Sequence, residues 1–103
     1  MICKYSVIQY VPDPVRNERV NVGVIVWSGN IVKTHFISDW RRIKDFFNCD
    51  LNPNVIKNLF IDADEEKINS MVCWGNSIQL SHHSISLCSI DQTLDLAIKR
   101  FLS

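Results

Sequence analysis

Residues 20–27, with the sequence VNVGVIVW, form a strongly apolar segment that decides the fold class. Read as a β-strand, this segment divides its side chains between two faces. The first face holds Val20, Val22, Val24 and Val26, and the second holds Asn21, Gly23, Ile25 and Trp27. Because one face is wholly valine and the other is largely apolar, the pattern is typical of a central strand covered on both sides.

Further strands are expected on either side of this segment along the chain. The tripeptide SGN at residues 28–30 predicts a tight turn into a strand over residues 31–36, so the two strands should form a hairpin. Upstream, residues 4–10 (KYSVIQY) are rich in β-branched and aromatic side chains and predict a first strand that stops at Pro12. Residues 11–19 should then form a stiff connection, because its two prolines restrict the backbone.

After the hairpin the apolar spacing becomes helical, and three short helices are expected. Ser38 or Asp39 should cap the first, Pro53 should open the second, and Asp62 with Glu65 has the capping-box spacing that would start the third. The inward residues expected are Trp40, Ile43, Phe46 and Phe47 in the first helix, Val55, Ile56, Leu59 and Phe60 in the second, and Ile68, Met71 and Val72 in the third.

The C-terminal part returns to strand alternation and ends in a helix. Residues 78–80 and 84–88 alternate, and the apolar phase slips by one across residues 81–83, which predicts a bulge or turn between them. Ser89 or Asp91 should cap the last helix. Its expected buried stripe consists of Leu94, Ala97, Ile98 and Phe101.

The order of elements predicts an α+β fold in one domain over residues 1–103. The expected order is β-β-β-α-α-α-β-α, with a mainly antiparallel sheet of about four strands packed against helices. A chain of 103 residues with 47% apolar residues fits a single compact core.

Charge and cysteine content narrow the function classes. Eleven basic residues balance eleven acidic ones, which argues against nucleic-acid binding and against attraction to an anionic membrane. No apolar run reaches the roughly 20 residues needed to span a bilayer, and no signal peptide is recognisable, so a cytoplasmic location is expected. The four cysteines contain no C-x-x-C spacing, and we expect free thiols, no metal and no cofactor.

Four polar residues gather before and within the core strand, namely Asp13, Arg16, Glu18 and Asn21. In an extended chain Arg16 and Glu18 share a face, which favours a guanidinium–carboxylate pair. Two interpretations stay open. These side chains form a polar network that fixes the loop to the sheet, with Gly23 admitting a backbone or ligand close to the strand. Alternatively, they line a catalytic pocket for an anionic group such as a phosphate.

The run over residues 5–27 resembles the opening signature of a family of small bacterial and phage-borne proteins, the domain of unknown function 3037 family. The matching pattern is Y-V-P-D-P-V-R-x-E-R-V-N-V-G-V. Because the family has no established activity, Arg16, Glu18, Asn21 and Gly23 carry over only as signature positions. Some members are encoded beside kinase-like proteins resembling the HipA toxins, and the resemblance therefore implies a small partner or regulatory subunit.

The remaining candidate binding residues are Trp40, Arg41, Arg42, Lys44, His82 and His83. The first four combine aromatic and basic groups, as in nucleic-acid contacts, but Trp40 fits the buried helical stripe, which favours a solvated basic face around a core tryptophan. The two histidines lie at the phase slip, where irregular backbone often carries function and where a plain surface turn is the alternative.

The leading hypothesis is a small protein-binding or regulatory module rather than an enzyme, because no phosphate loop, nucleophile elbow or zinc-protease motif occurs. Its expected partner is another protein, such as a HipA-like kinase or a defence protein. The expected setting is a toxin–antitoxin, phage-defence or counter-defence system. A homo-oligomer is also compatible with this sequence. The contact is expected on a sheet edge, such as the strand at residues 4–10, or on the helix over residues 39–48. The alternative is an enzyme acting on phosphate esters or nucleic acid through the Asp13, Arg16, Glu18 and Asn21 cluster.

Overall fold

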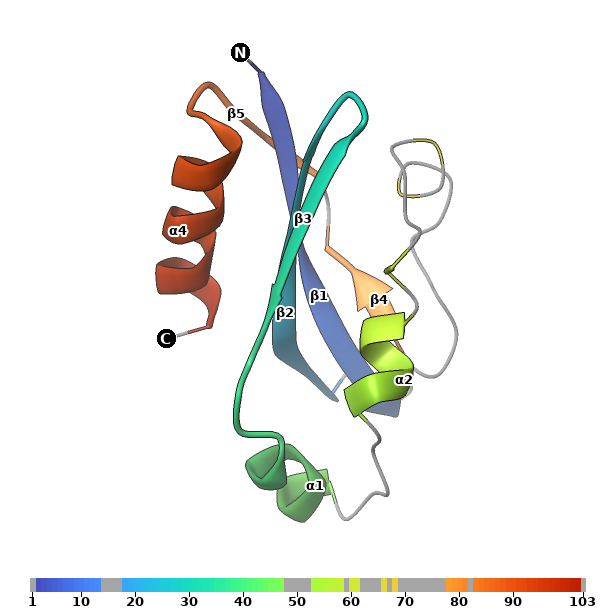
Figure 1. Ribbon diagram of the computed structural model, residues 1–103. Helices are drawn as coiled ribbons and strands as arrows, with labels where there is room; N and C mark the ends of the chain where they lie inside the picture. The colour runs from blue at the N-terminus through green and yellow to red at the C-terminus, as the bar shows by residue number, and fades with distance from the viewer. Residues whose placement is uncertain are drawn as a thin grey trace.

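The computed structural model describes residues 2–13, 18–47, 53–58, 60–61, 66, 68, 78–81 and 83–102. These residues form an antiparallel sheet with helices packed on both of its faces (Figure 1). The elements are β1 (Cys3–Asp13), β2 (Glu18–Ser28), β3 (Ile31–Phe36), α1 (Arg41–Phe47), α2 (Pro53–Asn58), β4 (Ile78–Leu80), β5 (Ser84–Ser86) and α4 (Ile90–Phe101). The predicted α+β class with an antiparallel sheet is therefore confirmed.

The strand order is β3-β2-β1-β4, and β5 pairs with β1 farther along the same side as β4. Among the described residues the sheet thus has five strands rather than about four, because the chain on either side of the predicted phase slip pairs separately with β1. Ser81 and His83 lie outside the two strands, as the phase slip predicted. The start predicted for a third helix at Asp62 and Glu65 lies outside the described residues, as do its Met71 and Val72.

Two expectations about β1 are wrong. It is not an edge strand, because β2 pairs with one of its sides and β4 and β5 with the other. It also does not stop before a long connection, since β1 continues to Asp13 and β2 already begins at Glu18. The register moves from Tyr10–Val20 to Asp13–Glu18, so β1 carries an extra residue beside Pro12. An irregularity of this kind accommodates a proline, which cannot donate to a regular ladder.

A second irregularity lies in the middle of β2. Ile8 pairs with Gly23, but the next residue, Gln9, pairs with Asn21, so Val22 is an extra residue in β2. An extra residue in one strand of an antiparallel pair shifts the alternation of the side chains that follow it. The predicted valine face of β2 is therefore divided at this point.

The two core clusters confirm this division. Val22 lies in the same cluster as Ile25 and Trp27, with Val20 packed against them, whereas Val26 lies in a separate cluster on the α4 side. Asn21 was expected on the same face as Trp27, but its side chain forms a hydrogen bond with the end of α4, which lies on the opposite face. The prediction that both faces of this strand are covered is correct, and the assignment of residues to the faces is wrong.

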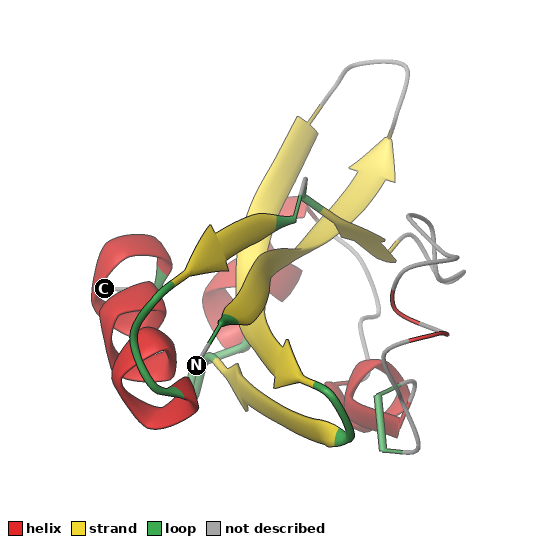
Figure 2. Cartoon of the chain, turned by 90° about the horizontal axis from the view of Figure 1, so that it is seen from above, coloured by secondary structure: helices red, strands yellow, loops and turns green. Residues whose placement is uncertain are grey.

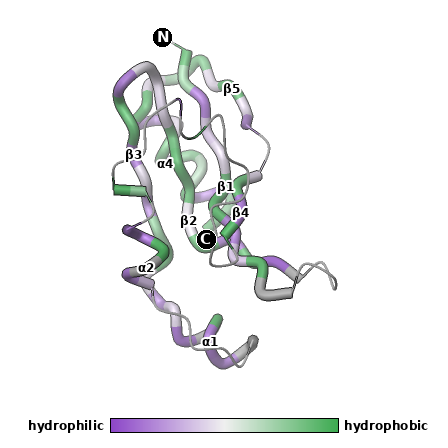
Figure 3. The backbone as a smooth tube through the Cα atoms, turned by 90° about the vertical axis from the view of Figure 1, so that its right-hand side faces the viewer, coloured by the Kyte–Doolittle hydropathy of each residue, from purple (hydrophilic) through white to green (hydrophobic). Residues whose placement is uncertain are grey.

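The larger core cluster lies between the sheet and the segment that contains α1 and α2. Its buried members are Ile8, Tyr10, Val22, Ile25, Trp27, Trp40, Ile43, Ile56, Phe60, Ile68, Ile78 and Leu80. The smaller cluster, Cys3, Val26 and Ile90, lies under α4. Seen from above, α4 stands on one side of the strands, with the C-terminus at its end (Figure 2). Along β3, hydrophilic positions interrupt hydrophobic ones (Figure 3), which fits a strand with one face toward the larger cluster.

Helix α4 begins where the sequence predicts. The Ser89 hydroxyl accepts a hydrogen bond from the Gln92 backbone N–H at 3.2 Å, and the Gln92 side chain accepts one from the Ser89 N–H at 3.4 Å. This capping box satisfies two backbone donors at the helix start. Of the predicted stripe, Ala97 is buried and the other three members are half-buried, while Ile90 and Thr93 complete the buried face.

Candidate functional site

The polar cluster of the β1–β2 hairpin is described in part. Arg16 lies outside the described residues, and for Asp13 and Glu18 the structure describes the backbone, which pairs across the hairpin, and not the side chains. The predicted pairing of Arg16 with Glu18 therefore stays a prediction, as does the enzyme alternative that requires both groups. Asn21 is the member whose side chain the structure describes.

The Asn21 amide joins three elements of the fold. Its Oδ1 accepts a hydrogen bond from Gln9 Nε2 at 3.2 Å, and its Nδ2 donates to the Phe101 carbonyl at 3.3 Å. Phe101 is the last residue of α4, where carbonyl groups lack a partner within the helix. Asn21 therefore supplies a donor to the helix end and ties α4 to β1 and β2. Its contacts agree with the structural interpretation of the cluster.

Gly23 admits the neighbouring strand, as the sequence predicts. A methyl group at position 23 would lie 2.8 Å from Cδ1 of the Phe36 ring and 2.9 Å from the His35 carbonyl oxygen. Real Cβ atoms essentially never approach other atoms so closely, so a side chain here would displace β3 or the ring. The absence of a side chain at position 23 thus sets where the Phe36 ring lies.

The aromatic and basic residues around α1 do not share a surface. Trp40 is buried in the larger core cluster, whereas Arg41 is exposed and its Nε lies 3.4 Å from Asp39 Oδ1. Lys44 is half-buried, and the side chain of Arg42 is outside the described part of the chain. The Asp39 carboxylate also accepts a hydrogen bond from the Arg41 backbone N–H at 3.1 Å, so it satisfies one backbone donor of the first helical turn. The arrangement matches a solvated basic face around a core tryptophan.

His83 packs against the core instead of facing open solvent. Its ring centroid lies 4.8 Å from that of Trp27, with the two rings nearly perpendicular at 84°. Edge-to-face packing of this kind adds to the burial of the tryptophan. His82 lies outside the described residues.

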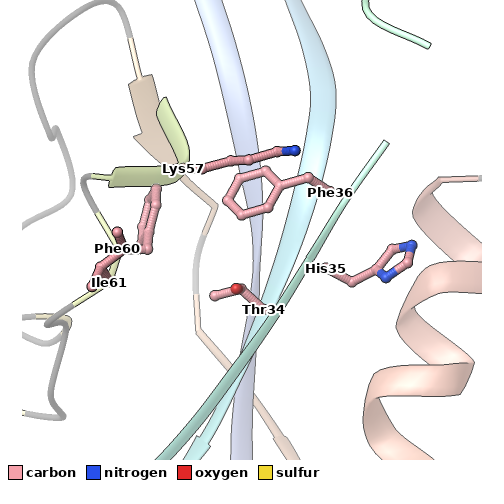
Figure 4. A pocket seen from close by; sticks show the side chains of 6 residues that line it. All are labelled: Thr34, His35, Phe36, Lys57, Phe60 and Ile61. Atoms are coloured by element: carbon pink, nitrogen blue, oxygen red, sulfur yellow. The ribbon is translucent and has the colours of Figure 1, made fainter. Parts of the chain in front are cut away.

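A pocket of about 360 Å³ opens between β3 and the end of α2 (Figure 4). Its lining residues are Thr34, His35 and Phe36 from β3, Lys57 from α2, and Phe60 and Ile61, which follow α2. Figure 4 shows Thr34 and Phe36 on the side of β3 that faces Phe60 and Ile61, with the Lys57 side chain beside the Phe36 ring. The His35 side chain points to the opposite side of the strand.

The pocket combines apolar walls with one cation. The rings of Phe36 and Phe60 lie 6.1 Å apart between centroids, and Ile61 is 70% exposed. The Lys57 side chain is exposed, and no carboxylate among the described side chains pairs with its ammonium group. A pocket of this kind suits an apolar side chain accompanied by a negative charge.

The pocket adjoins an open strand edge. Within the described part of the sheet, β3 pairs with β2 alone. The Ile37 N–H donates to the Val22 carbonyl at 3.0 Å, which places the backbone groups of residues 31, 33, 35 and 37 toward β2. Because backbone groups alternate in direction along a strand, those of Val32, Thr34 and Phe36 point away from the sheet.

A second hollow, of about 260 Å³, lies between β5 and α4. Its lining residues are Tyr5, Ile85, Ser86, Thr93, Leu96, Ala97, Arg100 and Phe101. The Arg100 guanidinium stands 5.4 Å from the Phe101 ring centroid, so this cation already has an aromatic partner.

Within the ranges that the structure describes, no group of three or more His, Cys, Asp or Glu side chains could hold a metal ion. No helix in those ranges has the length and apolar character needed to cross a bilayer. Cys3 and Cys88 carry free thiols, the first buried and the second exposed.

A family model described as "Protein of unknown function (DUF3037)" matches residues 5–76, well over half of the chain. The chain belongs to the DUF3037 family. The family membership that the resemblance implied is thereby confirmed. The match covers β1 from Tyr5 onward and all of β2, β3, α1 and α2, and with them every residue that lines the larger pocket. Comparisons with curated proteins and with solved structures gave no match.

Sequence reasoning singled out none of the residues of the larger pocket as a site. Phe36 and Phe60 were assigned to the end of a strand and to a buried helix stripe, and both do contribute to packing. Lys57 follows the buried Ile56 and precedes Phe60 by three residues, so its position at the border of an apolar helix stripe was a usable signal. The edge position of β3 depends on strand order, which has no local signal.

Proposed function

We propose that this protein is a non-enzymatic protein-binding module that takes up an extended segment of a partner protein along the outer edge of β3. The observation that carries the proposal is the outer edge of β3, which no other described strand covers, beside an apolar pocket. In this mode of recognition, main-chain hydrogen bonds supply affinity, and pockets for alternate side chains supply specificity.

The backbone edge and the pocket contribute in different ways. Val32, Thr34 and Phe36 each offer one outward N–H and one outward carbonyl, and a backbone hydrogen bond contributes about 0.5–1.5 kcal/mol net. Burying one Val, Leu or Phe side chain in the pocket adds about 1.5–3 kcal/mol. Association entropy opposes these gains by at least about 4 kcal/mol, so we expect a transient complex for a short segment alone.

The biological setting that supports this proposal is the one implied by the family resemblance. A small partner or inhibitor in a toxin–antitoxin, phage-defence or counter-defence pair acts by binding another protein, such as a HipA-like kinase or a defence protein, in the cytoplasm. Such a role requires a binding surface and no catalytic group. In this proposal, the β3 edge and its pocket provide the binding surface.

Peptide selection against the intact protein tests the proposal. A random peptide library should yield binders that slow amide hydrogen exchange at residues 32, 34 and 36. Thr34→Pro removes an outward N–H, while residues 33 and 35 keep their hydrogen bonds to β2, so this variant should lose the selected peptides. Thr34→Val retains the N–H and should bind them normally. Peptides that bind Thr34→Pro as tightly as the unaltered protein, without protecting these amides, would refute the proposal.

A further inference from the structure

The chemistry of the pocket restricts which segments could add to β3, and this inference rests on the proposed function above. In a sheet, residues directly opposite each other on neighbouring strands point to the same face. Residues of an added strand that lie opposite Val32, Thr34 and Phe36 therefore point to the pocket face. Residues opposite Lys33 and His35 point to the other face, which carries α4.

The two ends of the pocket differ in chemistry. Figure 4 places Phe60 and Ile61 across from Thr34, whereas Lys57 lies beside the Phe36 ring. A side chain opposite Thr34 thus meets apolar walls, and a side chain opposite Phe36 meets an ammonium group that lacks a carboxylate partner among the described side chains. The first position favours an aliphatic residue and the second favours Asp or Glu.

A second copy of this chain supplies these groups poorly. The β3 sequence IVKTHF contains no carboxylate, so a copy added along the same edge brings no acid to Lys57. Antiparallel pairing centred on Thr34 would also set Lys33 of each copy opposite His35 of the other. Charge complementarity therefore favours an acidic segment of a different protein.

We infer that the β3 edge recognises an antiparallel segment with the order acid–any residue–aliphatic. Every strand pair in the described sheet is antiparallel, and a residue opposite Thr34 can then exchange two hydrogen bonds with it. Because the segment runs against β3, its residue opposite Phe36 comes two places before its residue opposite Thr34. The acid thus precedes the aliphatic residue.

Three synthetic peptides with blocked ends test this order. The first, SVETLTS, carries the acid and leucine as inferred; the second, SVLTETS, exchanges them; the third, SVQTLTS, replaces the acid with glutamine. Binding is followed by amide shifts of residues 31–37 in a titration. The first peptide should bind about threefold more tightly than the third, the effect of one exposed ion pair. It should also bind more tightly than the second.

Variants of the protein assign the preference to one cation. Lys57→Met should abolish the difference between the glutamate and glutamine peptides, whereas Lys33→Met, an equal charge change on the other face of β3, should keep it. If the first and third peptides bind the unaltered protein equally tightly, the inferred order is wrong. If those peptides nevertheless shift the β3 amides, the proposed edge-binding function still stands. If none of the three peptides, nor any selected from the library, shifts those amides, both proposals fail. Self-association through β3, seen as concentration-dependent shifts of the same amides without peptide, would overturn the choice of a foreign acidic segment.

Discussion

Replacing Gly23 with alanine should test the packing that positions both β3 and the pocket. The new Cβ would lie 2.8 Å from Cδ1 of Phe36 and 2.9 Å from the His35 carbonyl oxygen. The ring can turn aside, but the carbonyl belongs to the β3 backbone, so β2 and β3 must move apart to relieve the second contact. The strain is therefore expected at the upper end of the range for overpacking, about 3 kcal/mol.

Alanine also lowers the conformational entropy of the unfolded chain, which raises the free energy of unfolding by about 0.5–1 kcal/mol. We expect a net loss of about 2 kcal/mol in the free energy of unfolding and a fall of about 8 °C in the melting temperature for a domain of this size. Urea denaturation followed by tryptophan fluorescence gives the first quantity, and a thermal melt gives the second.

Two further variants separate the sources of this loss. Gly29→Ala meets no atom within 4 Å but lies at a φ of 57°, so its cost should come from backbone conformation alone, about 1 kcal/mol. Phe36→Leu added to Gly23→Ala should recover part of the loss by removing the ring contact. If Gly23→Ala proves as stable as the unaltered protein, the close contact between β2 and β3 does not exist as described.

Three other substitutions have defined outcomes in urea denaturation. Asn21→Ala should lower the free energy of unfolding by about 1–2 kcal/mol and speed amide exchange at the end of α4, since the Phe101 carbonyl loses its donor. The control Asn30→Ala, in an exposed turn, should change the free energy of unfolding little. Ser89→Ala should cost about 1 kcal/mol by removing the helix cap, and a neutral result would contradict the capping box. Trp27→Phe should change the free energy of unfolding by no more than about 1 kcal/mol. The smaller ring loses packing, but the variant also removes a buried indole N–H that has no hydrogen-bond partner among the described residues, and the two effects oppose each other.

The parts of the fold that local sequence controls were predicted well. Ser89 was one of the two caps expected for α4, and the SGN turn joins strands that are adjacent in sequence, so both features follow from a few consecutive residues. The division of β2 into two faces could not be read in this way. Val22 is an extra residue because Ile8 pairs with Gly23 and Gln9 pairs with Asn21. This register depends on the pairing with β1, so it cannot be predicted from the sequence of β2 alone.

The candidate site shows the same limit. Phe36 and Lys57 are about twenty positions apart in the sequence, and they meet because α2 returns to the sheet beside β3. This proximity can be predicted only when the strand order is known. The sequence pattern did not give the strand order, since residues 4–10 were expected at an edge and lie inside the sheet. Asn21 was one of the candidate site residues, and the contact that the structure shows for it could not be anticipated, because its partner Phe101 is 80 residues away.

The two edges of the sheet differ in a way that bears on which one receives a partner. On one side lie β4 and β5, three residues each, separated by irregular backbone at residues 81 and 83, so that edge is short and interrupted. On the other side, the six residues of β3 pair with β2 in unbroken register and contain neither proline nor bulge. Natural sheets usually shorten, bend or charge such edges to prevent unwanted pairing. In β3 this protection consists of Lys33, whose charge lies on the face opposite the pocket and thus leaves the binding face open.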